Sequence, residues 1–307
     1  MGLHGLSSVT IGVPNVTETA AYYADFGLTP EADNWFSTSD AGRQLHIQYA
    51  PTRRLLEMRV AADDADDLAR VAASLGRLGI TADLSQTALK TAEPATGMRV
   101  LVEVAPRLEQ EPVPASIYNG PGRLERQDAR APGFTRTGKV RPRKLGHAVL
   151  GSTDHEASAA FFTDGLGFKV SDRIKGAGAF MRCSTDHHNV LVLGAPVNFL
   201  HHTSWQVDDV DEVGRGAFAM LEGNPERHVW GLGRHYAGSN FFWYLKDPAG
   251  NFSEYYSDMD CIIDDQLWKP EDLEGLRGLF AWGPPVPPSF LQPEDLAAMM
   301  TGTHAPR

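Results

Sequence analysis

Short apolar runs of strand length recur along this chain and are separated by amphipathic stretches with helical spacing. Two of these runs, 241–245 and 252–256, are rich in aromatic residues and flank the sequence Asp-Pro-Ala-Gly at 247–250. Aromatic and β-branched runs favour strands, and Pro and Gly favour the turn between them. The pattern therefore predicts a β-hairpin that carries Glu254 inside its second strand.

The order of these runs repeats once along the chain. Each half contains an apolar run, an amphipathic stretch and further apolar runs, and such internal similarity indicates a duplicated unit. Each half is therefore predicted to form a strand, a helix and several strands. The matching segments are 6–13 with 145–152, 19–28 with 158–167, 60–68 with 205–213, and 93–97 with 247–250.

Two segments lie outside the repeat. The first segment, at 106–143, is rich in Pro, Gly, Arg and Gln and has little hydrophobic periodicity, which indicates a linker or an irregular covering loop. The second is a proline-rich C-terminal arm with Trp268 and Trp282, which packs over the mouth of the second domain, elsewhere, or at a subunit contact. The expected divisions are an N-terminal domain without metal at 1–105, a linker at 106–143, a catalytic metal-binding domain at 144–260 and the arm at 261–307.

Three residues in strand-like runs are candidate metal ligands. His147 and His202 are each followed seven positions later by an acidic residue, Asp154 or Asp209, which precedes an amphipathic stretch. Glu254 is costly to bury among aromatic residues unless a positive charge accompanies it. Two imidazoles and a carboxylate on neighbouring strands form a facial triad, which suits Fe(II) with open positions, whereas zinc takes more nitrogen or sulfur ligands.

The first half of the repeat lacks these ligands, so only the second half is expected to bind metal. In the second half, His201 is the alternative to His202. We favour His202 because its distance from the following acidic residue equals that of His147. The positions opposite the three candidate ligands are Ser8 for His147, Glu57 for His202 and Leu101 for Glu254.

Composition narrows the class of protein further. The chain has 307 residues and a net charge of -11, which argues against a nucleic-acid partner. No run approaches 18 apolar residues and the N-terminus lacks a signal-peptide pattern, so we expect no membrane partner and a cytoplasmic location. The two cysteines, Cys183 and Cys261, have no CxxC spacing, and Cys183 is expected to be a buried thiol.

The repeat, the ligand set and the spacing from His235 to Glu254 resemble the vicinal oxygen chelate superfamily over residues 5–260, specifically the two-domain type I extradiol dioxygenases. The resemblance implies an α+β fold of two tandem domains, each a pair of βαβββ modules forming a partly closed barrel. It also implies Fe(II), with Mn(II) as the alternative, held by His147, His202 and Glu254. The implied reaction is ring cleavage of a catecholic substrate with O2 in aromatic catabolism, by a homo-oligomer.

Three further side chains match the catalytic positions of that family. His188, 14 residues before His202, is implied to be the base for a substrate hydroxyl and later the acid in O–O cleavage. His235 and Tyr244 lie 19 and ten residues before Glu254 and are implied to hydrogen-bond the substrate. His187 would point away from His188 if this segment were a strand.

Two other functions are possible on such a scaffold. A glyoxalase, an epimerase or a hydroxyphenylpyruvate-type dioxygenase would need the metal ligands but not the combination of His188, His235 and Tyr244. A protein that sequesters a small aromatic ligand without chemistry would need no metal triad. The presence of both sets favours the extradiol dioxygenase.

Overall fold

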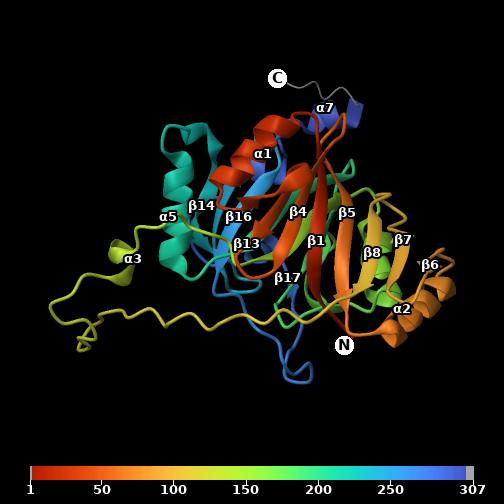
Figure 1. Ribbon diagram of the computed structural model, residues 1–307, viewed down its shortest axis with the longest axis horizontal. Helices are drawn as coiled ribbons and strands as arrows, with labels where there is room; N and C mark the ends of the chain where they lie inside the picture. Colours follow the sequence, from red (N-terminus) through yellow and green to blue (C-terminus); the bar gives the residue numbers. More distant parts are fainter. Residues whose placement is uncertain (1, 302–307) are drawn as a thin grey trace.

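Two mixed β-sheets with helices against them account for most of the computed structural model, which describes residues 2–301 (Figure 1). The first sheet has the strand order β2-β3-β4-β1-β5-β8-β7-β6. The elements of the first half are β1 (Leu3–Val13), α1 (Val16–Asp25), β2 (Thr29–Pro30), η1 (Ala32–Asn34), β3 (Trp35–Thr38), β4 (Gly42–Tyr49), β5 (Arg54–Ala62), α2 (Ala65–Arg77), β6 (Asp83–Leu84), β7 (Ala88–Ala92) and β8 (Arg99–Val104).

The second sheet has the order β14-β15-β16-β13-β9-β12-β11-β10-β17. The predicted hairpin is confirmed as β15 and β16. The elements of the second half are β9 (Lys144–Ser152), α4 (His155–Ala160), η2 (Phe161–Gly165), β10 (Lys169–Ile174), β11 (Gly178–Arg182), β12 (Val190–Gly194), β13 (Phe199–Gln206), α5 (Val210–Leu221), η3 (Pro225–Arg227), β14 (His228–Arg234), β15 (Phe241–Lys246) and β16 (Phe252–Ser257).

The strand register confirms the duplication and its alignment. β1 pairs with β4 in parallel and with β5 in antiparallel fashion, and β9 pairs with β12 and β13 in the same two ways. Thr10 lies opposite Glu57, as Val149 lies opposite His202, so Glu57 is the equivalent of His202. The expected α+β architecture of βαβββ modules is confirmed, and the recorded pairings leave each sheet open. The same register makes Ser8 equivalent to His147 and Leu101 equivalent to Glu254.

The acidic residues that follow the two histidines are helix caps. The Asp154 side chain accepts a hydrogen bond from the backbone N–H of Ala157 at 3.0 Å, at the start of α4. Asp209 accepts one from Glu212 N–H at 3.0 Å, at the start of α5. These bonds satisfy N–H groups that have no partner within the helix. The fixed spacing therefore records where a strand ends and the next helix begins.

Aromatic side chains hold the two halves together behind the second sheet. Phe26, just after α1, stacks on Tyr255 of β16 with ring centroids 3.8 Å apart, and the Tyr255 hydroxyl donates to the Phe26 carbonyl at 2.5 Å. Successive side chains of a strand point to opposite faces of the sheet. Tyr255 thus faces the first half, while Glu254 faces the other side of the sheet.

The segment between the halves is irregular, as expected. It runs along the molecule as an extended chain with one short helix, α3 (Pro132–Thr135) (Figure 1). No helix in the described part of the chain combines the length and apolar character needed to cross a membrane.

The C-terminal arm packs on the second half, as the first of the expected alternatives had it. Its elements are β17 (Asp272–Leu273), which extends the sheet beside β10, η4 (Gly275–Gly278), α6 (Pro288–Leu291) and α7 (Leu296–Thr301).

Arg53 anchors the end of the arm. This side chain from the first half is fully buried and binds Asp295 through two hydrogen bonds of 2.6 and 2.8 Å. It also donates to the Leu200 carbonyl of β13 at 2.7 Å. One guanidinium therefore joins the first half, the arm and a strand of the second sheet.

Candidate active site and metal centre

Three neighbouring strands bring the candidate ligands to one point. His147 lies on β9, His202 on β13 and Glu254 on β16, and these strands are adjacent in the second sheet. His147 Nε2 lies 3.1 Å from Glu254 Oε2 and 3.4 Å from His202 Nε2. One nitrogen or oxygen atom from each residue lies within 4.8 Å of the others, and all three side chains are buried. The structure thus assembles the set expected from the sequence.

Hydrogen bonds determine which edge of His202 faces this set. His201 Nε2 lies 2.7 Å from the Phe290 carbonyl, and His201 Nδ1 lies 2.7 Å from His202 Nδ1. Burial lowers the pKa of His201 to about 4 and also lowers that of His202, so both rings are neutral near pH 7. A carbonyl only accepts, so His201 carries its proton on Nε2 and accepts from His202 at Nδ1. The lone pair of His202 is therefore on Nε2, whereas the Nε2–H of His201 is directed at the Phe290 carbonyl.

The environment of Glu254 suits a cation. Its Oε1 accepts a hydrogen bond from Asn240 at 3.2 Å, whereas Oε2 has no hydrogen-bond partner among the residues described. Burial raises the pKa of Glu254, but the neighbouring imidazoles of His147 and His235 outweigh burial and leave the pKa lowered. An ionised carboxylate without water is costly unless a positive charge lies beside it. The free oxygen and the two imidazole edges fit a divalent ion.

His235 and Tyr244 form a hydrogen-bonded pair next to the ligands. His235 Nε2 lies 2.8 Å from the Tyr244 hydroxyl, and its Nδ1 contacts the Leu279 carbonyl of the arm. Burial, with a further contribution from Glu254, raises the pKa of Tyr244 well above 10, so this phenol stays protonated. Tyr244 can therefore donate a hydrogen bond. Trp243, the preceding residue on β15, points away and donates from Nε1 to His228 Nδ1 at 3.1 Å.

His188 lies on the other side of the triad. Its ring centroid is 4.1 Å from that of His147. Burial, followed by the charges of His147 and nearby histidines, lowers the pKa of His188, which is therefore neutral and able to accept a proton. The segment is not a strand, because His187 and His188 precede β12. His187 turns away from the cavity but keeps contact with His188, with Nδ1 atoms 3.1 Å apart.

These side chains enclose a small cavity of about 50 Å³. Its apolar wall includes Val149, Phe180 and Leu191 of the second sheet, and the arm adds Leu279 and Phe290. An aromatic ligand in this cavity would therefore contact Phe290 and Leu279.

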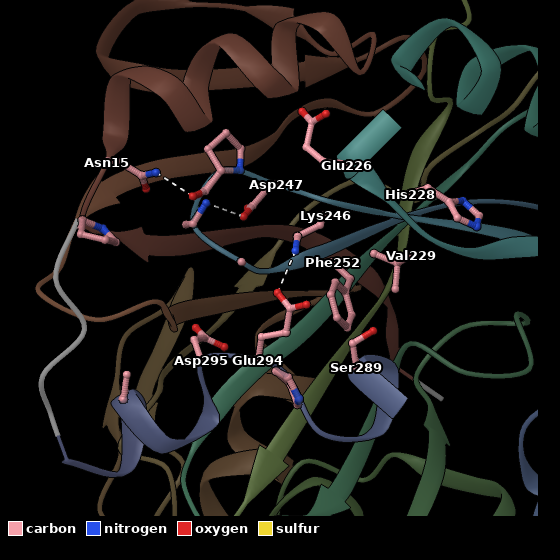
Figure 2. A pocket seen from close by; sticks show the side chains of 16 residues that line it. Asn15, Glu226, His228, Val229, Lys246, Asp247, Phe252, Ser289, Glu294 and Asp295 are labelled. Atoms are coloured by element: carbon pink, nitrogen blue, oxygen red, sulfur yellow. Dashed lines mark hydrogen bonds and ion pairs between the residues drawn. The ribbon is translucent and has the colours of Figure 1, made fainter. Parts of the chain in front are cut away.

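Larger hollows elsewhere on the molecule lack these side chains. One of about 740 Å³ lies beside the end of the arm, where Glu294 pairs with Lys246 at 3.0 Å (Figure 2). Another of about 970 Å³ is lined by residues of the first half, of the segment that follows it and of the second half. Neither is lined by His147, His202 or Glu254. The candidate residues His147, His202, His188, His235 and Tyr244 line the small cavity.

The sequence did not reveal the outer contacts of the histidines. The Asp172 carboxylate contacts His187, the Leu279 carbonyl contacts His235 and the Phe290 carbonyl contacts His201. All three groups come from distant segments, and no sequence pattern marks a backbone carbonyl as a partner. The two His-His doublets, 187–188 and 201–202, were the available signal. His188 lines the cavity while His187 contacts it from behind, whereas His201 and His202 both line the cavity and contact each other through Nδ1.

Two histidines and a glutamate on a sheet of βαβββ modules form a group that could hold one metal ion. Residues 144–255 match the Glyoxalase/Bleomycin resistance protein/Dioxygenase superfamily. This match lies in the half of the chain that carries the three candidate ligands.

Several proteins of similar sequence are dioxygenases by name. The chain is 36% identical over 205 residues to metapyrocatechase 2 of Cupriavidus necator, an alignment that covers 64% of this chain and 61% of that protein. The chain thus spans about three fifths of that relative's length. Homoprotocatechuate 2,3-dioxygenase from Brevibacterium fuscum has the same fold, with a TM-score of 0.73 at 18% identity over 94% of this chain and 91% of the other.

A structural relative with another name is also similar. The Mn(II)-bound glyoxalase from Novosphingobium aromaticivorans has a TM-score of 0.74 and 27% identity, covering 94% of this chain and 93% of the other. The metal named for that protein is manganese.

Proposed function

We propose that this protein cleaves the ring of a catecholic substrate beside one hydroxyl, with O2, at a single Fe(II) ion. The observation that carries the proposal is the presence of His188, His235 and Tyr244 around the candidate triad in one buried cavity. The catalytic unit in this proposal is 144–260, with 1–105 as a scaffold that lacks the ligands.

His147, His202 and Glu254 would hold the metal. A bound Fe(II) would stabilise a deprotonated diol and provide the redox path between ring and O2. Mn(II) is the alternative, because imidazole and carboxylate ligands suit both ions. The features that support this role are the Nε2 atoms of His147 and His202, which lie 3.1 and 3.7 Å from Glu254 Oε2, and the absence of a hydrogen-bond partner for that oxygen among the described residues.

The remaining groups of the chain would move and hold protons. His188, neutral in the buried site, would take the proton from a substrate hydroxyl. Tyr244, a protonated phenol whose hydroxyl lies 2.8 Å from His235 Nε2, would orient the substrate oxygen by hydrogen bonding. Val149, Phe180 and Leu191 would contact the ring and exclude water from the cavity.

A metal-dependent glyoxalase reaction is the second candidate. The 27% identity with the Novosphingobium aromaticivorans protein over nearly the whole chain favours it. Metal-assisted proton transfer in such an enzyme needs the triad, but it needs no acid/base histidine together with a His-Tyr pair. The presence of His188, His235 and Tyr244 makes the dioxygenase the stronger proposal.

Oxygen uptake tests the proposal. The protein is loaded with Fe(II) or Mn(II) under anaerobic conditions and mixed with catechol, methylcatechols, 2,3-dihydroxybiphenyl and carboxylated dihydroxybenzenes. We expect oxygen to be consumed in a one-to-one ratio with a yellow ring-fission product.

Other outcomes identify the alternatives. Turnover of a hemithioacetal of methylglyoxal and glutathione without oxygen uptake would favour the glyoxalase. Binding of a diol by metal-free protein, with no oxygen uptake in any metal-loaded form, would favour a ligand-sequestering protein. Either result contradicts the proposed reaction.

A further inference from the structure

A buried chain of hydrogen bonds extends from His188 away from the cavity. His188 Nδ1 lies 3.1 Å from His187 Nδ1, and His187 Nε2 lies 2.9 Å from Asp172 Oδ2 on β10. The other carboxylate oxygen, Oδ1, accepts the backbone N–H of Glu271 at 2.8 Å. His187 is fully buried and is not among the residues that line the cavity. The proposed reaction assigns it no contact with the substrate.

The partners determine where the protons lie in this chain. An ionised carboxylate only accepts hydrogen bonds, so Asp172 requires the proton of His187 to be on Nε2. When His187 carries this single proton, its Nδ1 atom is an acceptor and the His188 proton lies on Nδ1. His188 Nε2, on the opposite edge of the ring, is left with its lone pair. This is the edge available to the cavity that His188 lines.

We propose that Asp172 and His187 are positioning residues that hold His188 in the Nδ1–H form, with Nε2 open to receive a proton from the substrate. The inference rests on the proposed function for its catalytic consequence. The geometry is that of a carboxylate that fixes the tautomer of a catalytic histidine, here with a second imidazole between them.

The proton balance of the step is simple. The O–H bond of a substrate hydroxyl breaks, an N–H bond forms at His188 Nε2, and the electron pair stays on the oxygen. His188 becomes an imidazolium that still donates from Nδ1 to His187. The carboxylate of Asp172 stabilises this positive charge through His187, and no oxidant is needed.

The surroundings keep the pair in place. The His187 ring makes edge contacts with Phe180 and with Trp268 of the arm, at centroid distances of 5.8 and 5.3 Å. The backbone N–H of His187 donates to the Asp260 carbonyl at 2.9 Å. A ring enclosed in this way cannot turn over to exchange its two nitrogens without disturbing its neighbours.

The substitution Asp172→Asn is expected to reverse the direction of the hydrogen bonds that run from residue 172 through His187 to His188. The Glu271 N–H must still face an acceptor, so the amide oxygen takes that position and the amide NH2 faces His187. His187 Nε2 then becomes an acceptor, Nδ1 carries the proton, and His188 is forced into the Nε2–H form. The base would be blocked while its ring remains in place.

Nitrogen NMR reads the tautomers directly. Long-range proton–nitrogen spectra of the full-length, histidine-labelled protein are recorded metal-free and with diamagnetic Zn(II), with signals assigned from His187→Phe and His188→Gln proteins. We expect His188 as the Nδ1–H tautomer in the parent protein and as Nε2–H in Asp172→Asn. A parent protein with His188 in the Nε2–H form would overturn the inference, whether or not the variants fold.

Kinetics supply the second readout. For Asp172→Asn and His187→Phe we expect kcat to fall by about 10²–10⁴-fold, the range for loss of a general base, with KM and metal content changed by less than about threefold. The matched control is Glu271→Gln, which removes a nearby carboxylate bonded to Tyr236 but keeps the backbone N–H that binds Asp172. Full kcat in both Asp172→Asn and His187→Phe would overturn the positioning role.

Failure of the proposed function gives a different pattern. If the parent protein consumes no oxygen with any diol, the reaction is wrong, yet the NMR result for His188 still decides the tautomer. If the parent protein is active and His188 is Nε2–H, the reaction stands and the positioning role is wrong.

Discussion

The Nδ1 atoms of His201 and His202 lie 2.7 Å apart, and this contact leaves the Nε2 edge of His202 toward Glu254. His201 is fixed in turn by the Phe290 carbonyl of the C-terminal arm. A metal-bound histidine commonly donates its other N–H to a partner that orients the ring. In this protein the partner is another imidazole, and its own orientation depends on a segment outside the duplicated modules.

Replacement of His201 tests this dependence. His201→Phe leaves His202 Nδ1–H without an acceptor, so we expect metal affinity to fall by about 10–100-fold. His201→Asn is the matched control, because its amide oxygen can occupy the position of Nδ1 and should retain most of the affinity. Competition with a chromogenic chelator measures both values. Equal affinity in His201→Phe and the parent protein would show that the contact does not orient the ligand.

Replacement of Glu254 tests the metal centre itself. An ion that binds only the folded protein raises the free energy of unfolding, by about 2.7 kcal/mol at a concentration 100 times its Kd. We expect Fe(II) or Mn(II) to stabilise the parent protein in this way and to leave Glu254→Gln unchanged. Glu57→Gln, which removes a carboxylate of the first sheet bonded to Arg59 and Arg99, is the control and should respond like the parent protein. Thermal unfolding with and without metal gives the comparison.

Much of this architecture could be predicted from the sequence because its signals are local and occur twice. The spacing from His147 to Asp154 marks a strand end and a helix cap, and the same spacing follows His202. The orientations of the His187 and His188 side chains were harder to predict, since an irregular segment has no periodicity from which the direction of a side chain can be inferred. The arm's carbonyls at Leu279 and Phe290 could not be predicted, because which backbone oxygen meets which histidine depends on packing between distant segments.

The Arg53 and Asp295 pair should control the arm. Asp295→Asn leaves a buried guanidinium without its carboxylate, so we expect a loss of about 3 kcal/mol in the free energy of unfolding and faster proteolysis within the arm. Glu294→Gln is the neighbouring control, since its pair with Lys246 is exposed (Figure 2) and should contribute less than about 1 kcal/mol. Urea unfolding and limited proteolysis measure both effects. Equal losses in the two variants would contradict the anchoring role.

Asp247 should give the stability a characteristic pH dependence. Burial raises its pKa to about 6, despite hydrogen bonds from Asn251, whereas an unfolded aspartate titrates near about 3.9. The folded protein thus binds this proton more tightly than the unfolded chain does. The resulting stabilisation is complete below about pH 4 and is lost as the pH rises through about 6. Each unit of pKa difference corresponds to about 1.4 kcal/mol. We compare the free energies of unfolding of the parent protein and of Asp247→Asn, both treated with a chelator to remove metal. The parent value minus the variant value should fall by about 3 kcal/mol over this pH range. A constant difference would contradict the raised pKa.

Phe290 should limit the size of the substrate under the proposed function. Its ring lines the cavity of about 50 Å³, and its edge lies against Tyr244 with centroids 4.7 Å apart. Phe290→Ala keeps the backbone carbonyl that binds His201, so metal binding should be preserved while the cavity grows. We expect the ratio of kcat/KM for 2,3-dihydroxybiphenyl to that for catechol to rise by about tenfold, the equivalent of about 1.4 kcal/mol. Leu291→Ala, at an exposed neighbouring position, is the control and should leave the ratio unchanged. An unchanged ratio in Phe290→Ala, with metal content intact, would show that the arm does not form the wall that the substrate meets.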